Sequence, residues 1–577
     1  MSLSNSQKTY IKRNVRRLSI PEIARDLKIS EDEILRYLKK KWSKEKYNKF
    51  LSNRTDKTSV ASALISSFNL WSFIRANQYI LIFLVLLVLA VYFNSLGNSF
   101  VSDDIPAIVN NEKLGNFGNI FSESVLGSLR RLFYFFAFKI GGLNPLSYRI
   151  INLIFHLGST FLVFTLLSLL SKRSIAIVAA SIFAVHPILI ESVTWISGEP
   201  YSQYSFFFLL SFLTYILSKN DQKLFYISIF SCVLSLLSSE KAMVLFLILA
   251  LYEISFGSFK ENWKRISPFL VICITWIFIY LGKIGERVES LRMEHYQQSG
   301  GLINPLLQVP IAIASYLKLI FWPRKLTLYH TEMSFSAGQY ALCLLTFILL
   351  AGTIIYSCKK NKVIFFWLSF FIITLLPTLT PFGISWIVAE RYVYLGSLGI
   401  FAVIATLADK LTLRGENFRN AVYFALIIII IALSARTIVR NMDWKNEDTL
   451  WIATAKVSPS GPNIHNNLGD VYSRQGDLNK AAEEFQKAIE IKPGYADAYH
   501  NLANTYQRMG RFDAAIENYQ KAAELNPNLW QSHQALAAIY FEQEKYDLAL
   551  DEIKKALEIN PESEELKQNL QLIESKQ

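Results

Sequence analysis

Apolar residues occur in long blocks between residues 78 and 440, separated by short polar segments. Two of these blocks read YILIFLVLLVLAVYF (79–93) and VYFALIIIIIALSA (422–435). About 20 consecutive apolar residues allow a helix to cross the hydrocarbon core of a bilayer. The pattern therefore predicts an all-α, polytopic membrane helical bundle with about eleven spans. We place them at 78–97, 148–170, 174–196, 201–218, 224–239, 241–257, 266–283, 339–357, 362–380, 392–408 and 418–436.

One further apolar segment, VPIAIASYLKLIFW (309–322), is almost long enough to be a twelfth span. Counting it would put Lys359, Lys360 and Lys362 on the outer side, against the tendency of basic loop residues to stay in the cytoplasm. We therefore expect this segment to lie at, or dip into, the outer face.

The pattern changes after residue 461 to a period of 34 residues, which is the tetratricopeptide period. Its alternation of small and aromatic positions lets paired helices approach closely. We predict a half-repeat linker over 441–461, three repeats over 462–561 and a polar capping helix over 562–577. The residues in register are Pro493, Pro527 and Pro561; Leu468, Leu502 and Leu536; Tyr472, Tyr506 and Tyr540; Ala481, Ala515 and Ala549; and Ala488, Ala522 and Ala556.

Residues 1–77 are polar and have a helical pattern. Within them, LSIPEIARDLKISEDEILRYLKK (18–40) predicts two helices joined by a short turn, with Ser30 and Glu33 forming a capping box. The spacing resembles a helix-turn-helix. Because tethering to a bilayer hinders a search along DNA, we favour a small cytoplasmic domain that contacts protein or anionic lipid over a DNA-binding domain.

Charge fixes the predicted orientation. The chain has a net charge of +13, but residues 1–78 hold 17 Lys or Arg against 7 Asp or Glu, whereas residues 462–577 hold 12 against 19. A basic segment before the first span predicts a cytoplasmic N-terminus. With eleven spans between 78 and 440, the loops 98–147 and 284–338 and the repeats then lie outside. The four cysteines have no metal-ligand spacing and predict neither a disulfide framework nor a zinc site.

Two adjacent carboxylates, Asp103 and Asp104, follow the first span in FVSDDIPAIVNN (100–111). Acids beside a membrane entrance are candidates for function, and a carboxylate can serve as a general base for a hydroxyl. The alternative is a solvated turn, for which Asp-Asp-Ile-Pro is good sequence.

Further ionisable residues are predicted near the outer ends of spans. His186 and Glu191 occur in FAVHPILIESVTWISGE (183–199), where Pro187 should kink the helix. A His–Glu contact between helices would explain them equally well. Arginine binds phosphate through two parallel hydrogen bonds, so external arginines could bind an anionic leaving group. For residues 386–397 the alternative is an interfacial aromatic belt. The remaining candidates are Arg130 and Arg131 in the first loop, and Glu390, Arg391 and Tyr392 in WIVAERYVYLGS (386–397).

These blocks, with NPLSYRIINLIFHLGSTFLVFTLL (144–167), WKNEDTLW (444–451) and the repeats, resemble the transmembrane and tetratricopeptide-repeat O-mannosyltransferases, which are class-C glycosyltransferases (GT-C). The resemblance covers about 78–577, so that 78–440 would be the GT-C-like domain. It implies a polyprenyl- or dolichyl-phosphate mannose donor, inversion at the sugar carbon and transfer to Ser or Thr. It also implies an essential acid in the first external loop, for which we favour Asp103 with Asp104 in support, and a donor phosphate near Glu390, Arg391 and Tyr392.

The repeats are expected to bind the acceptor protein or peptide. Asn467 and Asn501 occupy the same repeat position and would face the concave side, where their amides could hydrogen-bond a peptide backbone; the alternative is ordinary repeat composition. We assign no cofactor, with a divalent cation as a candidate. We expect the protein in a bacterial inner membrane, or in the ER membrane if its source is eukaryotic.

Two other functions fit the same organisation. A ligase or polymerase of the O-antigen type would transfer an oligosaccharide from a lipid pyrophosphate. A membrane scaffold without enzymatic activity would use the repeats to recruit partners, and both aspartates would then be dispensable.

Overall fold

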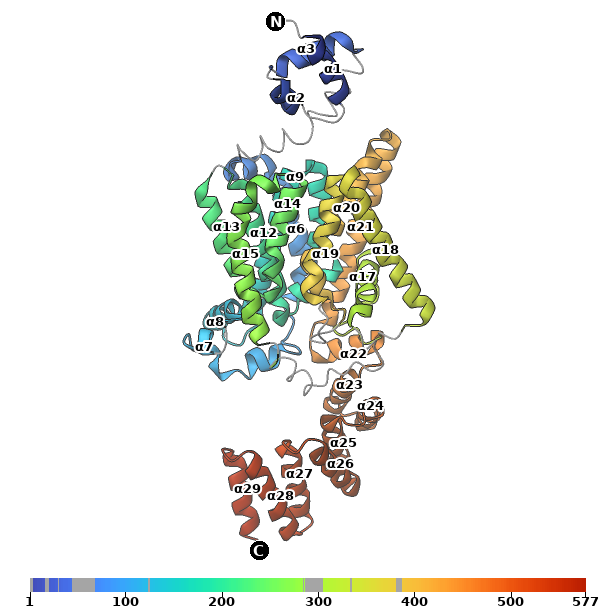
Figure 1. Ribbon diagram of the computed structural model, residues 1–577. Helices are drawn as coiled ribbons and strands as arrows, with labels where there is room; N and C mark the ends of the chain where they lie inside the picture. The colour runs from blue at the N-terminus through green and yellow to red at the C-terminus, as the bar shows by residue number, and fades with distance from the viewer. Residues whose placement is uncertain are drawn as a thin grey trace.

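A computed structural model describes residues 4–15, 20–27, 29, 31–43, 68–122, 125–219, 221–283, 285, 305–332, 335–379 and 387–576. In this part of the chain all regular elements are helical (Figure 1). The predicted fold class is confirmed: a helical bundle rich in apolar spans carries an α-solenoid at one end. Three short helices, α1 (Asn5–Asn14), α2 (Ile20–Leu27) and α3 (Glu31–Lys41), lie at the opposite end.

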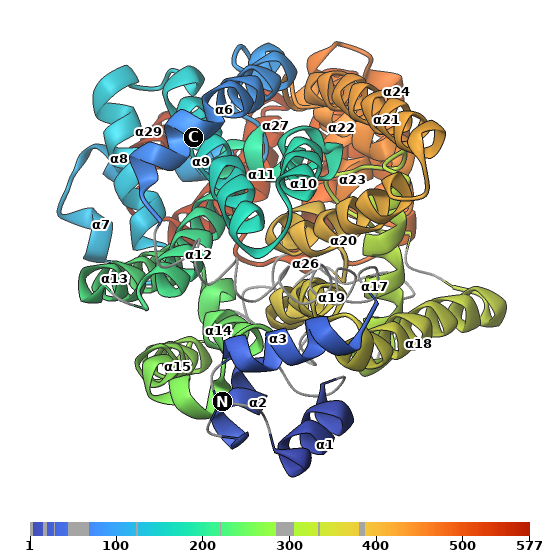
Figure 2. The same cartoon turned by 90° about the horizontal axis from the view of Figure 1, so that it is seen from above.

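The centre of the bundle is formed by α9 (Pro145–Leu170), α10 (Arg173–Val185), α12 (Glu199–Leu217) and α20 (Tyr394–Thr412). Inside the apolar windows of α9 and of the span that contains α20, 67% and 72% of residues are buried. The corresponding values are 6% for α18 (Ala337–Lys360) and 11% for α21 (Glu416–Asp443), which therefore face outward (Figure 2).

Small residues allow close helix packing in this centre. Helix α10 buries four alanines against its neighbours. Gly399 of α20 lies so close to α19 (Lys362–Leu375) that an added Cβ would be 2.3 Å from the carbonyl oxygen of Trp367.

The predicted number of eleven spans is not confirmed. By length and composition, six helices of the described residues can cross a membrane, or seven if the bent pair Arg173–Val185 and Pro187–Val193 is one span. The bend of 54° begins at His186, as predicted from Pro187. Segment 309–322 lies in α17 (Pro305–Phe321), which is shorter than these spans. Further helices of the bundle are α6 (Leu70–Tyr92), α8 (Ser128–Gly141), α13 (Gln222–Ser238), α14 (Leu245–Ser255) and α15 (Phe259–Gly282).

The N-terminal helices enclose a small apolar core that includes Ile11, Ile23, Ile34 and Leu38. Helices α2 and α3 occupy the two predicted helical segments. Ser30, half of the predicted capping box, lies outside the described residues.

The solenoid consists of three antiparallel helix pairs, with α22 (Glu447–Val457) before them and α29 (Glu564–Glu574) after them. The pairs are α23 (Pro462–Arg474) with α24 (Leu478–Ile491), α25 (Ala496–Arg508) with α26 (Phe512–Leu525), and α27 (Trp530–Glu542) with α28 (Tyr546–Ile559). The alanines predicted at contact positions, such as Ala481, Ala515 and Ala549, are fully buried. The register that the 34-residue period predicts is therefore the register of the structure.

The turn inside each repeat uses a left-handed residue. Gly476 and Gly510 have φ of 83° and 74°, and Glu544 occupies the same position in the third repeat with φ of 59°. A residue with a Cβ is disfavoured there. We expect Glu544→Gly to raise the stability of the solenoid by about 0.5–1 kcal/mol, measured as a higher thermal midpoint. An equal or lower midpoint would contradict this.

Candidate active site

Asp103 lies at the edge of a pocket of about 320 Å³ between the first loop and the solenoid. The loop contributes Ser102, Asp103 and Ile105, and Tyr329 enters from the segment after α17. The other side is formed by Glu447 and Trp451 of α22, and by Asn463 and Asn467 of α23. The structure thus brings together two predicted site residues, Asp103 and Asn467, that are 364 positions apart in the chain.

Asp104 points the other way and is fully buried. Its carboxylate accepts hydrogen bonds from the backbone N–H of Val101 (3.1 Å), the backbone N–H of Ser197 (2.8 Å) and the Ser197 hydroxyl (2.6 Å). Burial raises the pKa of Asp104 to about 6, although these hydrogen bonds and the charge of Arg149 act in the opposite direction. The doublet therefore divides into an accessible acid and a supporting acid that fixes the loop.

This raised pKa predicts a pH-dependent stability. A carboxyl group whose pKa is higher in the folded than in the unfolded chain favours folding in its protonated form. The contribution is complete below the ordinary value of 3.8 and is lost as the pH rises through about 6. We expect the thermal midpoint of the wild type, relative to that of Asp104→Asn, to fall between pH 4 and pH 6. Unfolding can be followed by tryptophan fluorescence, since Trp195, Trp367 and Trp444 are buried. If the difference between the thermal midpoints of the wild type and Asp104→Asn did not change with pH, the expectation would be wrong.

A second group of charges lies where α11 (Ile190–Val193) meets the turn η8 (Glu390–Val393). The fully buried Glu191 forms an ion pair with the Arg391 guanidinium through Nη1 and accepts the backbone N–H of Arg391 at 2.8 Å. The guanidinium lies 5.6 Å from the ring of Trp195 and 5.2 Å from that of Tyr392. The described hydrogen bonds of this guanidinium engage Nη1, but neither Nε nor Nη2, so donors remain for an anion.

Tyr392 is bordered by a second cation that the sequence did not suggest. The Lys241 ammonium lies 5.7 Å from the ring of Tyr392 and 5.0 Å from the ring of Tyr201, and it pairs with Glu240 at 2.8 Å. Two cation–carboxylate pairs therefore flank one aromatic side chain. Lys241 falls at the start of a predicted span, 241–257, and its charge at a helix end was the available signal.

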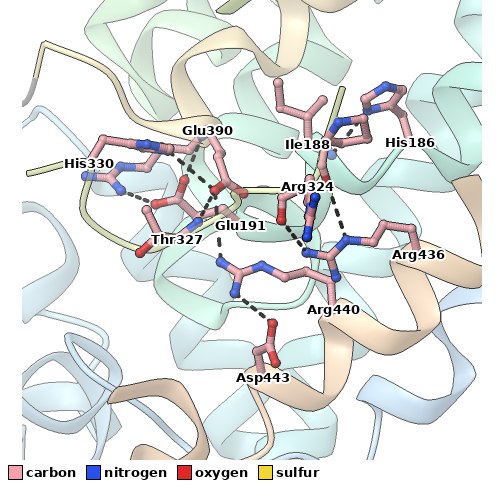
Figure 3. A network of polar contacts seen from close by, with 12 residues as sticks. His186, Ile188, Glu191, Arg324, Thr327, His330, Glu390, Arg436, Arg440 and Asp443 are labelled. Carbon is pink, nitrogen blue, oxygen red and sulfur yellow. Dashed lines mark hydrogen bonds and ion pairs between the residues drawn. The ribbon is translucent and has the colours of Figure 1, made fainter. Parts of the chain in front are cut away.

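Glu390 serves a different purpose from Arg391 (Figure 3). One oxygen, Oε1, accepts the backbone N–H of Thr327 at 2.5 Å and lies 3.6 Å from His330 and 3.9 Å from Arg440. Arg440 in turn donates to Asp443 at 2.9 Å. Glu390 thus connects the segment after α17 to the end of α21, and these contacts hold the turn that carries Arg391.

His186 does not pair with Glu191. Its Nδ1 accepts the backbone N–H of Ile188 at 3.2 Å, and its Nε2 lies 2.9 Å from the carbonyl oxygen of Ile320 (Figure 3). The imidazole therefore stabilises the bend between α10 and the following turn. The interhelical His–Glu contact considered from the sequence is replaced by the Glu191–Arg391 pair.

The two predicted arginines, Arg130 and Arg131, make contacts within and next to the first loop. Arg131 donates to the carbonyl oxygens of Ile120 and Leu126 at 2.8 and 3.3 Å. Arg130 lies 5.9 Å from the ring of Tyr134 and interacts electrostatically with buried Glu199. These contacts place both arginines in the support of the loop, away from the pocket of Asp103.

Arg149 has the same kind of role. It donates to the carbonyl oxygens of Asn98 and Ser99, both at 2.8 Å. The backbone that leads to Asp103 is therefore fastened to the buried helix α9.

The two predicted asparagines differ in position. Asn467 lines the pocket, and its Nδ2 donates to the carbonyl oxygen of Asn463 at 2.7 Å. Asn501 is one repeat further along, and its amide donates to Asn466 at 3.1 Å. Asn467 is near the candidate base, whereas Asn501 joins two neighbouring helices.

Comparisons with known proteins agree with this organisation. Family models described as "TPR repeat" and "Tetratricopeptide repeat" match 469–510, 496–529 and 530–563. "Protein O-mannosyl-transferase TMTC3" of Homo sapiens is 25% identical over 70% of this chain and 50% of its own length. "Protein O-mannosyl-transferase F38B6.6" of Caenorhabditis elegans is 25% identical over 72% of this chain and 63% of its own length. The predicted resemblance is therefore confirmed, and the chain spans about half the length of the first of these relatives.

Among solved structures, one described as "Crystal structure of MamA protein" aligns with 22% of this chain at 24% identity. The alignment includes 69% of that protein's chain and has a TM-score of 0.21.

Proposed function

We propose that this chain, a relative of curated protein O-mannosyl-transferases, is a membrane glycosyltransferase. It would move mannose from a polyprenyl- or dolichyl-phosphate donor to a Ser or Thr hydroxyl of an acceptor protein. One observation carries the proposal: an accessible carboxylate, Asp103, shares a pocket with side chains of the first repeat.

The acceptor side of the proposed reaction uses Asp103 as general base. The acceptor hydroxyl gives its proton to the Asp103 carboxylate while its oxygen forms the new bond to the anomeric carbon. An extended peptide passing over α23 could donate backbone N–H groups to the side-chain oxygen of Asn467, whose Nδ2 is already engaged. Trp451 and Tyr329, whose ring centroids are 6.1 Å apart, offer apolar faces beside the hydroxyl.

The donor side uses cations. As the glycosidic bond breaks, its electron pair stays with the lipid phosphate, which gains negative charge. Arg391 and Lys241, which lie 5.2 and 5.7 Å from the ring of Tyr392, are the groups we assign to this phosphate. The segment after α17 connects the two halves of the site, because Tyr329 lines the Asp103 pocket and the backbone N–H of Thr327 donates to Glu390, the residue before Arg391. No three His, Cys, Asp or Glu side chains gather into a metal site in the described part of the chain. A divalent cation stays a prediction, tested with a chelator.

We also propose that the pocket faces the external or lumenal side. The turn between α9 and α10 lies at the bundle end nearest the N-terminal helices (Figure 1), and it contains Lys172, which pairs with Asp409 at 2.8 Å. Cys358 is exposed near the end of α18, next to Lys359 and Lys360, which as basic residues favour the cytoplasmic side. A maleimide that cannot cross membranes should label Cys358 in sealed cells only after permeabilisation. Labelling of intact cells would refute the orientation.

The deciding experiment offers purified protein a set of lipid donors and a library of Ser- and Thr-containing peptides. We expect transfer of one mannose from the monophosphate donor. Transfer of an oligosaccharide from a pyrophosphate donor would instead favour the ligase alternative. No transfer with any donor, together with retained binding of partners by the repeats, would favour the scaffold.

Lys241 provides a separate prediction. Replacing it with methionine removes a positive charge near the proposed phosphate, and we expect the donor KM to rise about 10-fold while the acceptor KM stays within about 2-fold. Lys223→Met, at the opposite end of α13, is the matched control and should leave both constants unchanged. An unchanged donor KM in Lys241→Met would remove this residue from the donor site.

A further inference from the structure

The carboxylate of Glu447 joins the loop of Asp103 to the helix that precedes the repeats. Its Oε1 accepts the backbone N–H of Ser102, and its Oε2 accepts the indole N–H of Trp451 at 2.7 Å. Both oxygens are therefore engaged, one by the residue next to the proposed base and the other by an aromatic wall of the same pocket.

Ser102 has an unusual backbone. Its φ of 53° is in the left-handed region, which a residue with a Cβ seldom adopts unless its surroundings hold it there. The N–H that Glu447 accepts belongs to this residue. The conformation that presents Asp103 to the pocket is thus one that the isolated loop would seldom take.

The Asp103 side chain has little support of its own. It is exposed, and within the described part of the chain its carboxylate makes one long contact, of 3.5 Å, with the Ser102 hydroxyl. The flanking residues are fixed to the bundle, since Ser99 donates its N–H to Lys445 at 2.8 Å and Asp104 is held by Ser197. Glu447 acts between these two anchors, at the one residue of the turn with positive φ.

We infer that Glu447 is a positioning residue: it holds the strained Ser102 turn so that Asp103 faces the acceptor pocket, and it thereby makes the helix at the base of the repeats part of the reaction centre. The inference rests on the proposed role of Asp103 as the base. Because Glu447 and Trp451 also line the pocket, an acceptor seated there would contact the same side chains that set the base.

The test compares substitutions at two positions in the full-length protein. Glu447→Ala should lower kcat for transfer by about 10–100-fold, since small displacements of a catalytic group have large effects on rate. The donor KM should stay within about 2-fold. Adding Ser102→Gly should restore kcat by at least 5-fold, because glycine adopts the left-handed turn without the Cβ penalty. Adding Ser102→Ala should restore nothing. Asp448→Ala, one position along α22, is the matched control and should keep kcat.

Rescue by glycine but not by alanine separates positioning from a general structural role. If Glu447 merely kept α22 folded, neither substitution at Ser102 would help, and that result would overturn the inference. If Glu447→Ala does not accumulate, Glu447→Gln, which keeps the shape of the side chain, is compared with and without Ser102→Gly on the same criterion.

A measurement without substrate keeps this inference separate from the proposed function. Asp103→Cys, in a background with Cys343 and Cys358 changed to serine, can be labelled with a charged thiol reagent. Glu447→Ala should change the labelling rate at position 103 several-fold, and Ser102→Gly should return it toward the starting value. Unchanged labelling would refute the role of Glu447. Altered labelling, together with no transfer by the protein that keeps Asp103, would refute the proposed function alone.

Discussion

Asp103→Asn is expected to reduce glycosyl transfer by about 10²–10⁴-fold, the range over which a general base contributes to catalysis. Asparagine has nearly the same shape but cannot accept the proton of the acceptor hydroxyl. Because Asp103 is exposed and, among the described residues, its side chain makes one long contact, the substitution should leave folding and membrane insertion unchanged. Transfer is measured with a lipid-phosphate mannose donor and a peptide, and folding by the thermal midpoint.

Asp104→Asn is the comparison that separates the two acids. It introduces an amide N–H₂ where the buried carboxylate accepts N–H groups from Val101 and Ser197. We expect it to lower the thermal midpoint as well as the rate. If Asp103→Asn kept full transfer, the assignment of the base would be wrong.

Arg391→Ala is expected to have the largest effect on stability, about 3–5 kcal/mol, because it leaves the fully buried Glu191 without its ionic partner. Transfer should be lost as well, since the proposed phosphate site loses a cation. The measurements are the thermal midpoint in detergent and the rate of transfer by the protein that remains folded.

A double substitution distinguishes these two effects. Glu191→Gln with Arg391→Met removes both charges and keeps much of the volume, so it should recover most of the midpoint lost in Arg391→Ala. It should not recover transfer, because no cation faces the phosphate. Recovery of transfer by the double variant would show that Arg391 serves the fold and not the donor.

Features that depend on local periodicity were predictable from the sequence. The 34-residue period gave the register of the solenoid, and Pro187 gave the position of the bend. The number of spans was harder to predict, because hydropathy alone does not fix the length of a helix such as α14. That helix has 11 residues where the sequence suggested a span over 241–257.

Contacts between distant segments could not be predicted. Ser197 is 93 positions from Asp104, and Glu447 is 345 positions from Ser102. No periodic pattern connects such residues, and a single sequence contains no other signal of their proximity. The same limit applies to Arg391, for which a phosphate was foreseen but not the carboxylate of Glu191 that holds it.

The solenoid meets the bundle through α22 and its first repeat, while α29 ends it far from the pocket. In such an array each unit contacts its immediate neighbours and little else. If the repeats bind the acceptor as proposed, units inserted ahead of α29 would lengthen the surface offered to that polypeptide and leave the pocket of Asp103 unchanged. The number of repeats and the residues of the pocket can therefore change independently of each other in this architecture.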